Sequence, residues 1–286
     1  MQIGIRLHDT KPVSLENRLQ IVKEQGFTCA HVALSKVIKE FPVDNGALTP
    51  GLAMYLKKLF HDKGVDLAVL GCYLNLAHPD PAQLDKIRKT YLAHIRFASI
   101  LGCGVVGTET GAPNAEYKFE PACRSEEALR LFIENLHPVV AYAQTMGVIL
   151  AIEPVCNHIV YDARRAKQVL EEIASPNLQI ILDPVNLLGL HNYKDRAEVI
   201  EEAIDLLGDD VAVIHMKDFI IRDNSLVSVA AGSGELDYKP IIDFIHERKP
   251  FIHCTLEDTT PENAVTAREY IENMYRNVTM HSHFVS

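Results

Sequence analysis

Four stretches of apolar residues end in an acidic or histidine side chain, and these four side chains could together bind a metal ion. The stretches read AIE, IILD, AVIH and CTLE, and they end at Glu153, Asp183, His215 and Glu257. The intervals between them are 30, 32 and 42 residues. Three carboxylates that converge on one point repel each other strongly in a low-dielectric cavity unless a cation neutralises them. The pattern therefore predicts a divalent metal site.

Two glutamates, one aspartate and one histidine form an oxygen-rich ligand set with a single imidazole. Such a set suits Mn²⁺, Mg²⁺ or Co²⁺, and it accommodates Zn²⁺ as well. We take Mn²⁺ as the leading prediction and the other three ions as alternatives. A single acid at the end of a strand is often only the N-cap of the next helix or part of a surface ion pair. Independent caps have no reason to fall on four consecutive strands, so we favour the metal site.

The rest of the chain predicts the elements that position these residues. Short runs rich in Val, Ile and Leu alternate with longer amphipathic stretches, which is typical of βαβ units with a parallel sheet. We count eight such units. The predicted strands cover residues 2–7, 28–33, 66–71, 104–107, 148–153, 179–183, 211–215 and 251–257. The predicted helices cover residues 15–25, 49–63, 80–101, 125–146, 162–174, 194–207, 238–247 and 261–276.

The boundaries of these helices carry recognisable signals. Side chains that suit an N-cap precede four of them, at Ser14, Thr49, Ser125 and Thr260. Glycines follow five apolar helical runs, at Gly26, Gly64, Gly102, Gly147 and Gly208, where a left-handed C-cap favours glycine. These cap signals recur along the whole chain, and no linker interrupts them. They indicate one repeating strand–helix architecture.

An eight-stranded α/β barrel fits this pattern better than an open doubly wound sheet. Gly102, Gly104 and Gly107 match the spacing of a dinucleotide-binding motif, but they lead into a strand and do not open a helix. Barrels of this kind use about 250 residues as one domain, and their catalytic groups lie at the carboxyl ends of the strands. We therefore predict a single (β/α)₈ barrel domain over residues 1–286, with the four polar residues at its C-terminal face.

Strand alternation tests that arrangement, because residues two apart share a face. Ile149 and Ala151 should point inward with Glu153. Val211 and Val213 should point inward with His215.

Composition limits the classes of function. The net charge of −10 and pI near 5.7 disfavour a broad nucleic-acid surface, because phosphate binding needs clustered Lys and Arg. No apolar run reaches the length of about 18 residues that spans a bilayer, and the N-terminus has no signal-peptide pattern. We predict a cytoplasmic protein with no membrane or nucleic-acid partner, and we leave a homo-oligomer open. The six scattered cysteines are predicted to be reduced and mostly buried.

Nearly the whole chain resembles the sugar phosphate isomerase/epimerase group of xylose isomerase-like barrels. That group also includes ketose 3-epimerases, inosose dehydratases and endonuclease IV. The most specific motifs are VGTETG at 106–111, AIEP at 151–154, ILDPVN at 181–186, IHMKDF at 214–219, GSGELDY at 232–238 and TLEDTTPEN at 255–263. The resemblance implies that the metal ligands are Glu153, Asp183, His215 and Glu257.

The family chemistry follows from that ligand set. A metal that binds the carbonyl and adjacent hydroxyl oxygens of a sugar stabilises an enediolate, while one glutamate takes a proton from carbon and the other returns one. The resemblance thus implies that Glu153 and Glu257 are both ligands and catalytic acid/base groups. Return of the proton to the opposite face gives epimerisation, and return to the neighbouring carbon gives isomerisation.

The sequence departs from its relatives at positions close to the predicted ligands. Many relatives carry a histidine three residues after the aspartate, where this chain has Asn186. Ketose epimerases place an arginine six residues after the ligand histidine, where this chain has Ile221 followed by Arg222. We expect five residues to contact substrate: His8, Glu109, Asn186, Lys217 and Arg222. The structural alternatives are packing at the barrel rim for His8 and Glu109, and a salt bridge with Asp218 for Lys217.

The leading hypothesis is a metal-dependent isomerase or epimerase of a small-molecule sugar or sugar derivative. A dehydratase of a sugar or inosose uses the same enediolate chemistry and is the main alternative. A barrel that binds sugar without catalysis is a second alternative. An endonuclease is disfavoured, because Asn186 replaces an expected histidine and the chain is acidic.

Overall fold

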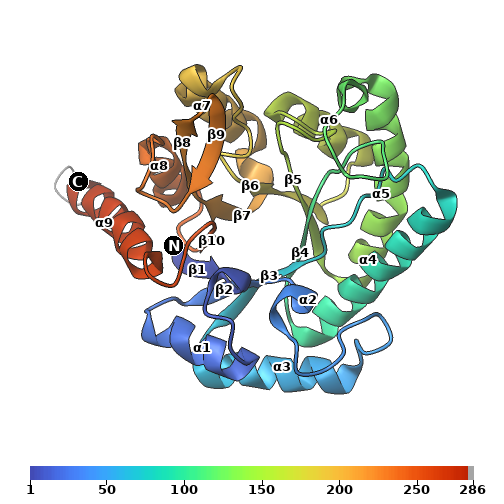
Figure 1. Ribbon diagram of the computed structural model, residues 1–286, viewed down its shortest axis with the longest axis horizontal. Helices are drawn as coiled ribbons and strands as arrows, with labels where there is room; N and C mark the ends of the chain where they lie inside the picture. The colour runs from blue at the N-terminus through green and yellow to red at the C-terminus, as the bar shows by residue number, and fades with distance from the viewer. Residues whose placement is uncertain (283–286) are drawn as a thin grey trace.

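Eight parallel strands close into a barrel in a computed structural model that describes residues 1–282. The order around the barrel is β1-β10-β7-β6-β5-β4-β3-β2. Figure 1 shows these strands at the centre of the molecule with helices around them. The barrel strands are β1 (Gln2–Arg6), β2 (Cys29–Val32), β3 (Asp66–Gly71), β4 (Val105–Glu109), β5 (Ile149–Glu153), β6 (Leu178–Leu182), β7 (Val211–Met216) and β10 (His253–Leu256). The predicted (β/α)₈ barrel is confirmed.

The helices follow the strands in the order that the sequence predicts. The long helices are α1 (Leu15–Glu24), α3 (Pro50–Lys63), α4 (Pro81–Leu101), α5 (Glu126–Met146), α6 (Ala163–Ile173), α7 (Arg196–Leu207), α8 (Lys239–Arg248) and α9 (Ala264–Ser282). A four-residue helix that was not predicted, α2 (Leu34–Val37), follows β2.

Most of the predicted helix boundaries are confirmed by their caps. The side chains of Ser14, Thr49 and Ser125 accept hydrogen bonds from the first turns of α1, α3 and α5. Two expectations were wrong. The last helix begins at Ala264, three residues later than predicted. Gly208 has φ −54° and continues into a short 3₁₀ turn in place of a left-handed cap; this φ does not require glycine.

Two separate apolar clusters hold the barrel together. The larger lies between the strands and the helices. The smaller fills the barrel and consists of Cys29, Ala68, Val69, Ala151, Ile181 and Val213, with Ile149 packed against it. Glu153 and His215 therefore share the inward face with Ala151 and Val213, as predicted. Val211 instead belongs to the larger cluster, contrary to the prediction, because the pairing of β6 and β7 shifts by one residue between Val211 and Val213 and breaks the alternation.

An antiparallel hairpin that the sequence did not predict extends from the end of β7. It consists of β8 (Asp218–Arg222) and β9 (Ser225–Val229), and it is drawn in orange near α7 and α8 in Figure 1. The buried Asp218 carboxylate accepts hydrogen bonds from the backbone N–H groups of Phe219, Gly234 and Leu236. Asp218 thus fixes the base of the hairpin and is not the partner of Lys217.

All six cysteines are free and buried, in agreement with the sequence. None of the helices within residues 1–282 is long and apolar enough to cross a membrane.

Candidate metal centre

Glu153, Asp183, His215 and Glu257 converge at the carboxyl end of the barrel. Glu153 ends β5 and His215 lies in β7, while Asp183 and Glu257 directly follow β6 and β10. One potential ligand atom from each residue lies within 4.8 Å of the others, and all four residues are buried. Parallel strands of similar length bring their ends to one rim. For this reason four positions far apart in the sequence form one cluster.

His215 lies between the two glutamates. Its Nδ1 atom is 3.3 Å from Glu153 Oε1 and 3.3 Å from Glu257 Oε1. Burial alone would lower the pKa of His215, but the Glu257 and Glu153 carboxylates outweigh that effect and raise it to about 9. Without a metal ion, the imidazole is therefore protonated at neutral pH and partly neutralises the cluster.

Two further cations balance the carboxylates. Lys217 Nζ lies 2.9 Å from Asp183 Oδ2 and 3.4 Å from Glu257 Oε2. Arg6, at the end of β1, places Nη1 3.1 Å from Glu257 Oε2. Burial would raise the pKa of Glu257, but His215, His31, Lys217 and Arg6 hold it well below its usual range. Burial raises the pKa of Asp183 to about 6, although Lys217 acts in the opposite direction.

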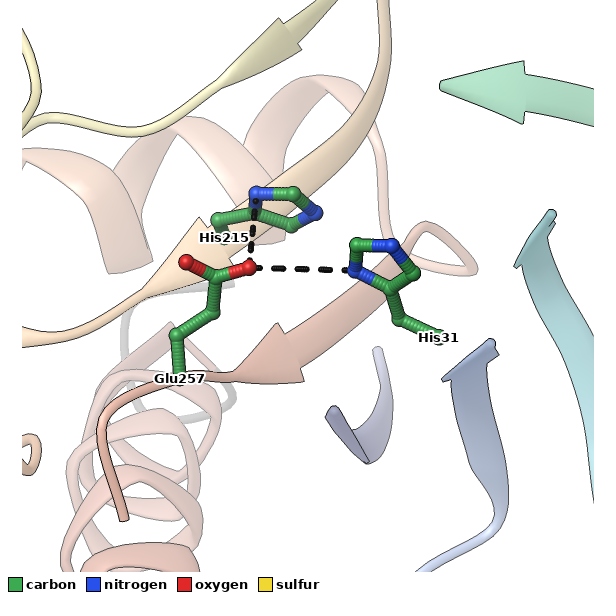
Figure 2. A group of neighbouring side chains, drawn as sticks. All are labelled: His31, His215 and Glu257. Atoms are coloured by element: carbon green, nitrogen blue, oxygen red, sulfur yellow. Dashed lines mark ion pairs between the residues drawn. The ribbon is translucent and has the colours of Figure 1, made fainter. Parts of the chain in front are cut away.

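His31, from β2, is a second buried histidine at this centre. Its Nδ1 atom lies 3.7 Å from Glu257 Oε1, and its ring stacks on His215 at a centroid distance of 5.1 Å. Figure 2 shows one carboxylate oxygen of Glu257 paired with a ring nitrogen of each histidine. His31 Nε2 is 3.2 Å from the Tyr73 hydroxyl. A Cβ at Gly71 would lie 2.8 Å from both His31 and Tyr73, so a glycine there makes room for this pair.

Two of the predicted substrate contacts lie beside Glu153. Asn186 Nδ2 donates a 2.6 Å hydrogen bond to Glu153 Oε1. Glu109 is the register partner of Glu153 in the adjacent strand, and it accepts a hydrogen bond from the Tyr117 hydroxyl at 3.1 Å. Burial and the neighbouring Glu153 carboxylate raise the pKa of Glu109 to about 7.

A cavity of about 310 Å³ opens over the centre, and we call it the metal cavity. Four of the five predicted substrate contacts line it: His8, Glu109, Asn186 and Lys217. Arg222 does not, because it is exposed at the end of β8 in the hairpin. Lys217 pairs with Asp183 and Glu257, in place of the alternative salt bridge with Asp218.

Several residues that line the metal cavity were missed at the level of sequence: Arg6, His31, Lys36, Tyr73, His158 and Asp258. Two of them carried a usable signal. Arg6 lies two residues before His8, so in an extended strand the two side chains would lie on the same face. His31 interrupts an otherwise apolar strand. Tyr73 and His158 lie in loops, where no periodicity indicates direction.

The side chains at this centre fit a divalent ion. Asp183 Oδ2 is buried, and Lys217 Nζ balances its charge from 2.9 Å. Three buried carboxylates and one imidazole whose ligand atoms lie within 4.8 Å of one another form a donor set that suits a divalent ion. Asp183 Oδ1, by contrast, accepts hydrogen bonds from the backbone of Val185 and Asn186. The same carboxylate thus fixes its loop through Oδ1 and directs Oδ2 to the cluster, where an ion would share this oxygen with Lys217.

One protein-family model matches this chain. Residues 19–276 match the model of the xylose isomerase-like TIM barrel. No curated protein matches the sequence. Solved structures with a similar fold include a D-tagatose 3-epimerase-like protein, at 17% identity and TM-score 0.76, over 99% of this chain and 100% of that one.

Two other solved structures have the same fold and different descriptions. The IOLI protein with a bound zinc atom is 18% identical, with TM-score 0.71, over 98% of this chain and 97% of that one. A probable 3-DHS dehydratase from Bacillus anthracis is 14% identical, with TM-score 0.72, over 98% of this chain and 99% of that one.

Proposed function

Because the chain belongs to the xylose isomerase-like TIM barrel family, we propose that it is a metal-dependent isomerase or epimerase of a sugar or sugar derivative. The observation that carries this proposal is the buried cluster of Glu153, Asp183, His215 and Glu257, whose ligand atoms lie within 4.8 Å of one another under an open cavity. Its relatives by fold include proteins described as an epimerase-like protein and as a dehydratase.

We assign the four clustered residues as ligands of one divalent ion, with Mn²⁺ as the preferred metal. When bound, the ion would supply a Lewis acid that favours negative charge on oxygens of the substrate as a neighbouring carbon loses its proton. The zinc atom bound by the IOLI protein, which has a similar fold, supports the proposal that this chain binds a metal ion. Zn²⁺, Mg²⁺ and Co²⁺ are the alternatives.

Glu153 and Glu257 are the proposed acid/base pair. Their strands β5 and β10 are separated in the barrel by β6 and β7, so their carboxylates approach the cavity from different sides. One takes a proton from carbon, and the other returns a proton to the opposite face or to the next carbon. Asn186 orients Glu153 through its 2.6 Å hydrogen bond, whereas His31 and Arg6 orient Glu257.

Lys217, Glu109 and His8 are the proposed contacts to substrate oxygens. Burial lowers the pKa of Lys217, but the Asp183 and Glu257 carboxylates outweigh it and raise that pKa. Lys217 therefore remains a cation beside the metal position and can donate to a hydroxyl or carbonyl oxygen. Burial and the cations Arg6 and Lys36 lower the pKa of His8 to about 3, so His8 acts as a neutral hydrogen-bonding group.

Proton exchange at carbon tests the proposal. Protein that has been freed of metal and then supplied with Mn²⁺ is incubated in D₂O with a panel of ketoses, aldoses and inososes. We expect deuterium at carbon in one substrate class, with product of unchanged mass apart from the label. A product lighter by one water would instead identify a dehydratase. Metal binding without exchange in any substrate would identify a barrel that binds sugar without catalysis and would overturn the proposal.

The affinity for metal should rise with pH. The ligand form of His215 is the neutral imidazole, whereas the metal-free form holds a proton up to its pKa of about 9, so metal and proton compete. We expect the apparent affinity for Mn²⁺ to rise by up to about tenfold per unit from pH 7 to about 9. Protonation of Asp183 steepens the loss below about pH 6. Calorimetric titration in anaerobic buffers measures this, and an affinity independent of pH would contradict the assignment of His215.

A further inference from the structure

A second cavity adjoins the metal cavity and is not used by the chemistry proposed above. It has a volume of about 420 Å³, and we call it the side cavity. Val155 and Asn186 line both cavities. Because the Asn186 side chain also bonds Glu153, the side cavity begins one side chain away from the proposed acid/base group.

Hydrogen bonds between two loops hold the floor of the side cavity in place. It is formed by the loops after β5 and β6, which are bonded to each other: Cys156 N donates to Asn186 O at 2.7 Å, and Cys156 Sγ donates to Leu188 O at 2.9 Å. Asn192 fixes the second loop by accepting from Gly189 N and donating to Leu187 O. A Cβ at Gly189 would lie 2.9 Å from the His191 ring, so glycine lets this loop close on itself.

The β8–β9 hairpin supplies the outer wall. Ser225, Leu226 and Ser228 of β9 line the side cavity. The hairpin is an addition to the eight-stranded barrel, and three backbone N–H groups that donate to the buried Asp218 carboxylate hold its base. The wall therefore has a fixed position relative to β7, which carries His215.

The two cavities differ in charge. The metal cavity is lined by acidic and basic side chains, including Arg6, Lys217 and Glu257. Among the described residues, none of the side chains that line the side cavity is Asp, Glu, Lys or Arg; its surface combines leucines with Asn157, Asn186, His191 and Ser228. Apolar surface with a few placed amide, imidazole and hydroxyl groups suits a neutral polyhydroxylated ring, whose C–H face packs on leucine while its hydroxyls form hydrogen bonds.

We infer that the side cavity is a subsite for a second sugar ring, so that the substrate is a glycoside whose reacting ring occupies the metal cavity. This inference deepens the proposed function and rests on it for the place of the reacting ring. A free monosaccharide would leave the side cavity to water, whereas a disaccharide would use both cavities and span Val155 and Asn186.

Ligand-observed saturation-transfer NMR tests this inference on the full chain supplied with Mg²⁺. The probes are cellobiose, maltose, lactose and lactulose, each compared with its component monosaccharides. We expect at least one disaccharide to bind about tenfold more tightly than either of its components and to receive saturation on both rings. If no disaccharide binds more tightly than its components, or if only one ring receives saturation, the inference is wrong.

Two variants of β9 form a matched pair. Ser228 lines the side cavity, whereas Val227, the preceding residue of β9, does not. We expect Ser228→Phe to reduce the ratio of disaccharide to monosaccharide affinity to near one, because the new ring fills the subsite. Val227→Phe should keep the wild-type ratio. An equal effect of both variants on that ratio would contradict the assignment of the side cavity as a sugar subsite. Saturation of both rings with the wild-type protein tests the same assignment without either variant.

Deuterium exchange on the same samples separates the two proposals. A disaccharide held through both rings, without exchange at carbon for any metal, would support the subsite and overturn the proposed function. Exchange with a monosaccharide, together with no gain in affinity for any disaccharide, would support the function and overturn the subsite.

Discussion

Glu153→Gln and Glu257→Gln should each abolish measurable turnover. Loss of a general acid or base lowers a rate by about 10²–10⁴-fold, and here each residue is assigned one of the two proton transfers. Glutamine keeps a carbonyl oxygen that can lie near the metal position, but it cannot accept a proton. Turnover is followed by NMR with the substrate class identified by deuterium exchange. Near-normal turnover in either variant would show that the acid/base assignment is wrong.

The two variants should differ in one respect. The variant that keeps the abstracting base can still exchange the substrate proton in D₂O without completing the reaction. We therefore expect carbon-bound deuterium in unreacted substrate from one variant and not from the other. Glu127→Gln is the control, because Glu127 is exposed in the first turn of α5; it should exchange and turn over like the wild type.

Asp183→Asn and His215→Ala should each lower the affinity for Mn²⁺ by at least about tenfold, a loss of about 1.4 kcal/mol or more. Both changes remove a proposed ligand. In the first variant, the asparagine side chain keeps a carbonyl oxygen that can still accept the hydrogen bonds from Val185 and Asn186, so the loop should hold its shape. Calorimetric titration after chelation measures the affinity.

The control for the metal titration is His61→Ala. The side chain of His61 is 87% exposed at the end of α3, far in sequence from the four clustered residues. The affinity of this variant should equal that of the wild type. Unchanged affinity and stoichiometry in both ligand variants would remove the basis for the metal site.

The barrel and the four clustered residues could be predicted because both depend on local pattern. A buried strand requires an apolar run, so the polar residue that ends each run stands out in the sequence. Repetition of the strand–helix unit then places all four at the same rim. The hairpin at β8 and β9 was missed because its residues follow His215 without a break. Its position depends on hydrogen bonds that backbone N–H groups 16 and 18 residues away donate to the Asp218 carboxylate.

The ion-pair partners of the charged residues could not be predicted, because they too lie far away in the sequence. Lys217 lies next to Asp218 in sequence, yet it pairs with Asp183 and Glu257 from other strands. Arg222 was expected at the site because of its offset from His215, but the hairpin carries it to an exposed position. His31 reaches Glu257 only because β2 and β10 both neighbour β1 in the closed barrel. Such contacts depend on closure of the barrel.

The most direct test of the central claim is anomalous diffraction from crystals of the protein grown with Mn²⁺. We expect one strong anomalous peak per chain, in contact with oxygens of Glu153, Asp183 and Glu257 and with a ring nitrogen of His215. A metal-loaded crystal with no anomalous peak among these four side chains, or with its peak elsewhere in the molecule, would contradict it.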